Sequence, residues 1–238
     1  MQDYELMLDA YARAGGTPSV FKDSDVAHLV VHKNTVIGSH LVDGLILEPV
    51  ETESGVQVRL IVKKGVRIQR PVHLCFGVMA EEGVQEIVMN VELQDGSGLE
   101  LLAHCVFPNA VKVVHSMAAE IEVGDNASYS YNEVHFHGEN GGIEVIPRAK
   151  IRIGKNSRLV THFSLLQGRA GRLDLDYDTE ILDGSTLEMT AKVYGSGADR
   201  IRIREAGHLC PFGTDAESVG LVKQQEFSSN QAGTPSRR

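Results

Sequence analysis

The feature that most constrains this 238-residue chain is a regular recurrence of glycine through its middle. Glycines at positions 65, 96, 124, 154 and 184 are separated by 31, 28, 30 and 30 residues. An alternating apolar–polar segment precedes each of them, and a second such segment follows. A fixed period of this size indicates a repeat architecture, because a unit of two strands buries its apolar face only by stacking on the next unit.

The corners of these units also resemble one another. They read DGS at 95–97, GDN at 124–126, GKN at 154–156 and DGS at 183–185. Glycine and Asx residues supply the positive-φ conformations that sharp turns require. The pattern predicts an all-β chain folded as a parallel β-helix, or β-solenoid. A β-sandwich or jelly roll is the alternative, since its hairpins also recur with turn residues. The even spacing favours the solenoid.

The two ends of the chain depart from the repeat. Residues 3–14 carry an apolar stripe and are followed by two glycines, which predicts a short helix. We therefore expect an N-terminal helix with entry strands at 1–55, a β-helix core at 56–205 and a divergent tail at 206–238. The tail is polar and lacks periodic apolar positions, so we expect it to be disordered.

The charge and the missing motifs exclude several classes of function. A net charge of −9 argues against a surface that follows nucleic-acid phosphates. No apolar stretch is long enough for a bilayer, and no signal segment follows Met1, so a cytoplasmic protein without membrane contact is predicted. The three cysteines lack CxxC spacing and are expected to be thiols. The sequence contains no P-loop or hydrolase motif, so ATP dependence would have to come from a partner, and no catalytic residue is predicted.

Two cysteines lie 30 residues apart, at nearly equivalent places in successive units: Cys75 and Cys105. Equivalent positions of a β-helix stack about 4.8 Å apart. Two stacked thiols can hold a persulfide or bind a soft metal together. His73 precedes Cys75 by two residues, so the two side chains are expected on one face of the strand. The alternative is that both cysteines are small apolar core residues.

His135 and His137 are the most metal-like pair in the chain. They are also two residues apart, with Glu133 nearby, and can chelate a transition metal from one face of a strand. The alternative is a surface strand whose imidazoles face solvent, with Val134 and Phe136 directed to the core.

Three carboxylates alternate along a later segment, at Asp174, Asp176 and Asp178. They can bind a cation or serve as an acid–base pair, but a solvated outer face neutralised by Arg169 and Arg172 explains them more simply. Near the end of the predicted core, Cys210 lies two residues after His208, and we expect an exposed loop thiol there.

At residues 70–77 (RPVHLCFG) and 103–110 (AHCVFPNA) the chain resembles the SufB/SufD family, scaffold proteins of the SUF iron–sulfur cluster assembly system. Further matching stretches are 81–85, 133–138, 171–177 and 201–205, and the resemblance covers roughly residues 1–205. The resemblance implies a right-handed parallel β-helix, a SufC-like ABC-type ATPase as partner, and pairing with a SufB/SufD-type paralogue or a second copy. It also implies a transient iron–sulfur cluster.

On this resemblance we predict a non-enzymatic scaffold subunit in iron–sulfur cluster assembly. The candidate cluster-binding residues are Cys75, Cys105 and His73, and the candidate metal ligands are His135 and His137.

Two alternatives stay open. One is a β-helix polysaccharide lyase or hydrolase that uses Asp174, Asp176 and Asp178. The other is an inactive, truncated solenoid that only self-associates. The second alternative arises because the resemblance fades after Glu205, whereas family members continue with further coils and a helical segment that contacts the ATPase. That segment cannot be carried over to this chain.

Overall fold

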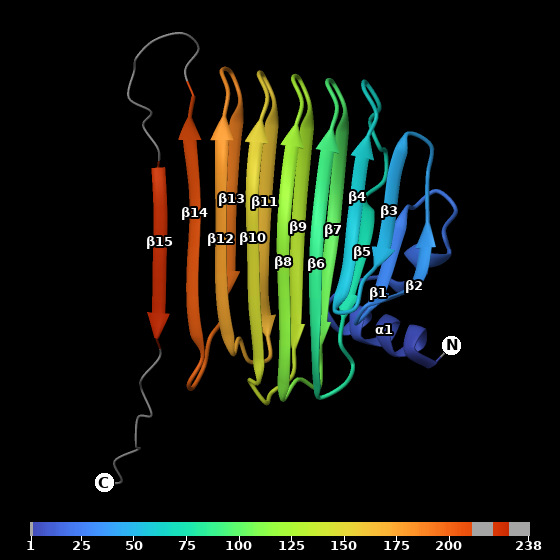
Figure 1. The fold of residues 1–238 in the computed structure, drawn as a ribbon, viewed down its shortest axis with the longest axis vertical. Helices are drawn as coiled ribbons and strands as arrows, with labels where there is room; N and C mark the ends of the chain where they lie inside the picture. The colour runs from blue at the N-terminus through green and yellow to red at the C-terminus, as the bar shows by residue number, and fades with distance from the viewer. Residues whose placement is uncertain (1, 211–220, 229–238) are drawn as a thin grey trace.

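Two β-sheets lie face to face and wind into a β-solenoid of about five turns, shown in Figure 1. The structure is a computed structural model that describes residues 2–210 and 221–228. The prediction of an all-β parallel solenoid with one short N-terminal helix is confirmed. The space between the two sheets is called the lumen below.

Through the middle of the chain, successive strands alternate between the two sheets, whereas at each end two consecutive strands share a sheet. Sheet A runs in the order β13-β11-β9-β7-β5-β1-β2, and sheet B in the order β15-β14-β12-β10-β8-β6-β4-β3. The strands of sheet A are β1 (His28–His32), β2 (Thr35–His40), β5 (Val72–Gly77), β7 (Gly98–Phe107), β9 (Ser128–His137), β11 (Arg158–Gln167) and β13 (Thr186–Val193). Those of sheet B are β3 (Leu45–Glu51), β4 (Gly55–Val62), β6 (Glu82–Leu93), β8 (Lys112–Val123), β10 (Ile143–Ile153), β12 (Arg172–Ile181), β14 (Arg200–Leu209) and β15 (Leu221–Ser228).

Each complete coil contributes one strand to each sheet, and equivalent strands pair in parallel. The pairing of β8 with β10 runs without interruption from Val113 opposite Ile143 to Val123 opposite Ile153. Burial alternates along these strands, because successive side chains point to opposite faces. Every second residue of both sheets therefore faces the lumen, which is filled mainly by leucine, isoleucine and valine side chains.

The corners at one end of the coils explain the sequence period. The positive-φ residues there are Gly65, Gly96, Asn126, Asn156 and Gly184, separated by 31, 30, 30 and 28 residues. Asparagine thus supplies the left-handed conformation in two corners where the sequence pattern pointed to glycine. Gly124 and Gly154 serve close packing instead. A Cβ atom on Gly124 would lie 2.8 Å from the backbone nitrogen of Asp95, and one on Gly154 would lie 2.7 Å from the carbonyl carbon of Gly124.

The N-terminal segment covers part of the outer face of sheet A. The helix α1 (Gln2–Arg13) and the 3-10 helix η1 (Pro18–Lys22) pack near β1, β5 and β7 (Figure 1). Met7 and Tyr11 are spaced one turn apart and fully buried, which places an apolar stripe against the sheet. Gly15, with a φ of 91°, follows the helix in the left-handed conformation.

Antiparallel strands lie at both ends of the parallel ladder. At the N-terminal end β2 pairs with β1, and β3 pairs with β4. At the other end β14 continues to Leu209, four residues beyond the predicted core boundary, and β15 pairs with it. The predicted tail thus includes a strand at Leu221–Ser228, whereas 211–220 and 229–238 lie outside the described residues. None of the described helices has the length and apolar character needed to cross a bilayer.

Candidate functional site

The strand β9 directs three polar side chains into the otherwise apolar lumen. Glu133, His135 and His137 are 3%, 2% and 1% exposed, respectively. The reading of this strand as a surface strand is therefore wrong, and its two faces are the reverse of that alternative. Phe136 points outward, where it packs with the buried side of α1. The predicted ligands His135 and His137 do share one face, and that face is the interior.

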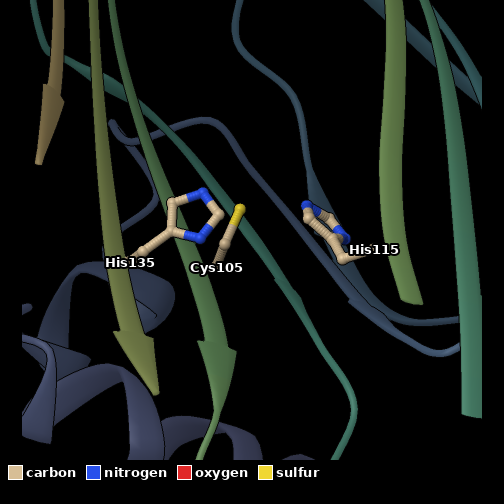
Figure 2. A group of neighbouring side chains, drawn as sticks. All are labelled: Cys105, His115 and His135. Carbon is tan, nitrogen blue, oxygen red and sulfur yellow. The ribbon is translucent and has the colours of Figure 1, made fainter. Parts of the chain in front are cut away.

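Two residues on neighbouring strands complete this group. Cys105 on β7 lies directly opposite His135 in the parallel register. His115 on β8 faces the same space from sheet B, and Figure 2 shows the Cys105 sulfur between the two imidazole rings. One ligand atom from each of the three residues lies within 4.8 Å of the others. We call Cys105, His115, Glu133, His135 and His137 the lumenal cluster.

Glu133 is the hub of the lumenal cluster. Its Oε1 atom is 2.6 Å from Nε2 of His135, and the thiol of Cys105 points to the same oxygen at 3.9 Å. Its Oε2 atom accepts hydrogen bonds from the hydroxyls of Tyr131 at 2.8 Å and Tyr177 at 3.4 Å. A carboxylate buried this deeply is tolerated only when it is paired and hydrogen-bonded, and Glu133 satisfies both conditions.

The hydrogen bonds of His137 determine which nitrogen of each ring carries a proton. Nδ1 of His137 lies 2.9 Å from the carbonyl oxygen of Arg169, which can only accept. Nε2 of a neutral His137 is therefore an acceptor, and it lies 3.2 Å from Nδ1 of His135. His135 consequently donates through Nδ1, and its Nε2 atom faces Glu133. Asp199 fixes Arg169 in turn, with contacts of 2.8 and 3.1 Å to the guanidinium.

Burial controls the ionisation of the lumenal cluster. It lowers the pKa values of His115 and His137 to about 3, so both rings are neutral near pH 7. Burial and the Glu133 carboxylate raise the pKa of the Cys105 thiol, so that it is protonated. Burial also opposes ionisation of Glu133, but the hydrogen bonds from His135 and Tyr131 outweigh it and lower the pKa of this carboxyl group.

Cys75 and Cys105 do not stack. Phe76, and not Cys75, lies opposite Cys105, so the two thiols project to opposite faces of sheet A. Cys75 is buried on the outer face beneath Met7 and Tyr11 of α1. The expectation of a joint thiol site is therefore wrong, because the two units are one residue out of step.

His73 lies on the same outer face as Cys75, as the spacing predicted. Its Nδ1 atom is 2.9 Å from the Tyr11 hydroxyl, which donates because burial raises the pKa of Tyr11 to about 12. His28 and His104 are buried on this face too, and each has an Nδ1 atom without a partner among the described residues. The helix α1 and η1 thus cover a group of imidazoles that are separate from the lumenal cluster.

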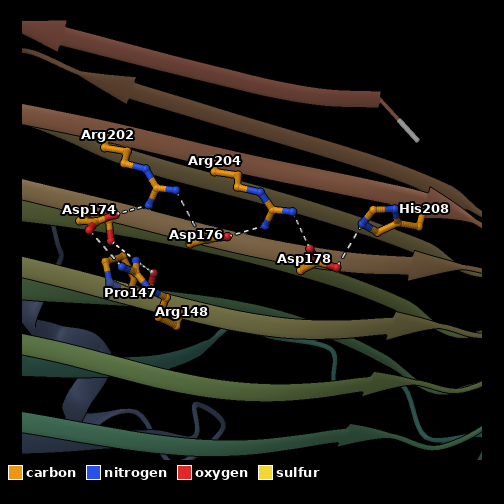
Figure 3. A network of polar contacts seen from close by, with 8 residues as sticks. All are labelled: Pro147, Arg148, Asp174, Asp176, Asp178, Arg202, Arg204 and His208. Atoms are coloured by element: carbon orange, nitrogen blue, oxygen red, sulfur yellow. Dashed lines mark hydrogen bonds and ion pairs between the residues drawn. The ribbon is translucent and has the colours of Figure 1, made fainter. Parts of the chain in front are cut away.

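The three alternating aspartates form an ion-pair ladder on the outer face of sheet B, shown in Figure 3. Asp174 pairs with Arg148 at 3.0 Å and Arg202 at 2.7 Å, and Arg204 lies 2.6 Å from Asp176 and 2.8 Å from Asp178.

The arginines expected to neutralise the ladder lie elsewhere. Arg169 contacts Asp199, and Arg172 contacts Glu144. Hydrogen bonds from the ladder arginines outweigh the burial that raises the pKa of Asp174, and those from Arg204 and His208 lower that of Asp178. Ionised and paired carboxylates are poor general acids, so this surface favours a structural role over a lyase site.

Arg148 has a second task beside the ladder. Pro147 lies within β10, lacks an N–H group, and coincides with a gap in the pairing of β10 with β12 between Val145 and Arg148. The Arg148 guanidinium donates to the carbonyl oxygen of Asp174 on β12, beside this gap (Figure 3). It thereby supplies a donor where the proline has none.

His208 and Cys210 do not converge on a site. Nε2 of His208 contacts Asp178 at 3.2 Å, whereas the half-buried Cys210 thiol lies 3.9 Å from the His208 carbonyl oxygen.

His115 and Asp199 are the site residues that the sequence reasoning missed. The buried positions alternate around His115, at Val113 and Met117, and this spacing is a signal for an inward-facing side chain, but its partners come from the other sheet.

Two curated proteins resemble this chain, whereas no family model matches it. An iron–sulfur cluster assembly SufBD family protein of Pyrococcus horikoshii is 31% identical over 209 residues, which cover 88% of this chain and 63% of that protein. A SufBD family protein of Methanocaldococcus jannaschii is 31% identical over 193 residues, 79% of this chain and 61% of that protein. The chain therefore spans less than two thirds of the length of these relatives.

Proposed function

The chain belongs to the SufB/SufD family, and on that premise we propose that it is a non-enzymatic scaffold subunit in iron–sulfur cluster assembly. The observation that carries the proposal is the lumenal cluster: a thiol, three imidazoles and a carboxylate brought together inside the solenoid. Thiolate and imidazole are the protein ligands that suit iron and iron–sulfur clusters. In this role the iron–sulfur cluster is cargo that the scaffold holds transiently.

The proposed partners follow from the family and from the absence of a nucleotide-binding motif in the sequence. The sequence contains no P-loop, so the energy of ATP would enter through a SufC-like ABC ATPase. A SufB/SufD-type paralogue or a second copy of the chain would complete the assembly. We place this complex in the cytoplasm, away from membranes and nucleic acid.

The candidate residues divide between the two faces of sheet A. Cys105 and His135 belong to the lumenal cluster and would handle iron, with His137 holding the His135 ring. Cys75 and His73 form a second thiol–imidazole pair under α1. Sulfur would reach that pair only when the helix moves aside, because the Cys75 side chain is fully buried.

Anaerobic cluster assembly tests this function. The protein, with a SufC-type ATPase, ATP, ferrous iron and sulfide, should develop cluster absorption and transfer the cluster to an apo-ferredoxin. Cys105→Ser and Cys75→Ser should each lower the yield of transferred cluster, whereas Cys210→Ser, a control at the half-buried third thiol, should not. Full transfer by the Cys75→Ser, Cys105→Ser double variant would remove both thiols from the proposal.

A further inference from the structure

We propose that the lumenal cluster is a site for one divalent metal ion, with Cys105, His115 and His135 as its ligands. The proposal deepens the function given above and rests on it for the identity of the ion, which would be ferrous iron on its way into a cluster. It changes the expected ligand set, because His115 from sheet B replaces His137.

The donor set and its spacing are the first support. The ligand atoms of the three residues lie within 4.8 Å of one another and come from three strands, β7, β8 and β9. One thiolate and two imidazoles bind borderline ions such as iron(II), cobalt(II) and zinc(II) more readily than magnesium or calcium. Bonds of about 2.0–2.3 Å need only a small contraction of this group.

His115 supplies the second support, because its buried ring leaves a polar atom without a partner beside the other two ligands. The side chain is 3% exposed, and its Nδ1 atom has no hydrogen-bond partner among the described residues. Buried polar atoms are nearly always satisfied, so an orphaned imidazole nitrogen points to a water or an ion. His115 is also aimed at the right place, since its ring centroid is 5.8 Å from that of His135 (Figure 2).

His137 is a positioning residue in this scheme. It accepts from Nδ1 of His135 and donates to the Arg169 carbonyl oxygen. Metal-binding histidines commonly donate their second N–H in this way, which fixes the ring and its tautomer. The chain from His135 through His137 to Arg169 therefore presents Nε2 of His135 toward Glu133 and Cys105.

The charges of the site select a divalent ion. Without metal, Oε1 of Glu133 accepts a hydrogen bond from the Cys105 thiol, and its 2.6 Å contact with Nε2 of His135 requires a proton between these two atoms. Binding breaks the S–H bond of Cys105 and displaces the proton held between His135 and Glu133, forms metal–sulfur and metal–nitrogen bonds, and releases these two protons to solvent. A divalent ion with one thiolate and the Glu133 carboxylate again sums to zero, as a buried site requires.

Cobalt(II) is the probe for this proposal. The reduced, full-length protein, refolded with and without cobalt(II), should bind one ion, show thiolate-to-cobalt charge-transfer absorption and release two protons per ion. Cys105→Ser should abolish the charge-transfer band, and His115→Gln should abolish tight binding. His137→Asn should weaken binding about 10–100-fold but keep the band, as expected for a residue that orients a ligand.

Matched variants keep the outcome decisive. His104→Gln alters another buried histidine with an unpartnered Nδ1 atom, on the outer face of sheet A, and Cys210→Ser alters another thiol. Both should bind cobalt(II) like the parent, and circular dichroism should show that every variant is folded. Normal binding by folded His115→Gln, a charge-transfer band in Cys105→Ser, or no uptake by the parent would overturn the site. Cobalt(II) binding without cluster transfer would instead reject only the assembly function.

Discussion

Arg148 shows how a single side chain can repair a defect in a sheet. Proline is disfavoured in a central strand because it removes a ladder hydrogen bond. Pro147 nevertheless lies inside β10, between β8 and β12. The guanidinium of Arg148 fills the position of the missing donor and pairs with the Asp174 carboxylate at the same time. Its contribution thus differs from that of an ordinary surface arginine.

Replacing this arginine should reveal the difference. Arg148→Ala is expected to lower the free energy of unfolding by about 1–3 kcal/mol, because the Asp174 carbonyl loses its donor. Arg158→Ala is the control, since Arg158 makes only an exposed contact of 3.5 Å with Glu188 and should cost no more than about 1 kcal/mol. Urea unfolding of both variants measures the two values. Equal costs would show that the sheet does not depend on the Arg148 donor.

At the scale of elements, α1 is docked over histidines rather than over a purely apolar surface. His28 and His73 lie beside each other in the parallel register beneath α1 and η1. Burial is the largest cause that lowers the pKa of each, and the neighbouring His28 and Arg70 lower the pKa of His73 further. The Tyr11 hydroxyl remains protonated, so it carries no negative charge that would stabilise a protonated imidazole beside it. The neutral imidazoles are therefore part of the packing.

This arrangement predicts that α1 undocks as the pH falls. The unfolded chain binds protons at His28 and His73 below about pH 6.5, whereas the folded chain resists them. The stability contributed by these two neutral histidines is therefore fully present above about pH 6.5. It is lost as the pH falls from there toward their lowered pKa values in the folded state. The reaction of Cys75 with a thiol reagent should accelerate as the pH falls below about 6.5, once corrected for the pH dependence of a free thiol.

A double variant separates this effect from general acid unfolding. His28→Gln with His73→Gln should flatten the pH dependence of Cys75 reactivity. Cys105 serves as the internal control, because it lies in the lumen on the opposite face of sheet A and should stay unreactive. Exposure of both thiols at the same pH would mean that the whole solenoid opens, and that α1 does not respond by itself.

At the scale of the whole molecule, the solenoid is a one-dimensional stack. Each coil contacts chiefly the coil before and the coil after it, so stability is close to a sum over coils and their interfaces. Among the described residues, β13 is the edge strand of sheet A on the C-terminal side, and its side chains are more exposed than those of β11. The stack is therefore expected to be weakest at this edge and strongest in the middle.

Two leucines in register measure this gradient. Leu159 on β11 is fully buried, and Leu187 lies opposite it on β13 but is only partly buried. Leu159→Ala should cost about 2–5 kcal/mol of unfolding free energy, the usual range for a buried leucine. Leu187→Ala should cost clearly less, as followed by urea unfolding. A larger loss at Leu187 would contradict a stack that frays from the β13 edge.

The period of about thirty residues and the alternation within it were sufficient to predict the solenoid. Both are local: a turn needs a residue that tolerates positive φ, and a strand with one buried face needs apolar side chains at every second position. The helix at α1 was predictable for the same reason, since its apolar stripe and the glycines after it are adjacent in the chain. Asn126 and Asn156 could take the place of glycine because asparagine also tolerates that conformation.

Only part of the lumenal cluster could be predicted from these local patterns. The spacing of His135 and His137 showed that they share a face, and Cys105 stood out as a thiol, but the period could not say which face is the interior. A shift of one residue in register reverses every side chain of a strand. Cys75 and Cys105 therefore looked equivalent, although one lies under α1 and the other in the lumen. Only the stacked coils, with β8 of sheet B opposite β9 of sheet A, bring His115 to Cys105 and His135, because contacts across the lumen depend on tertiary packing rather than on spacing along the chain.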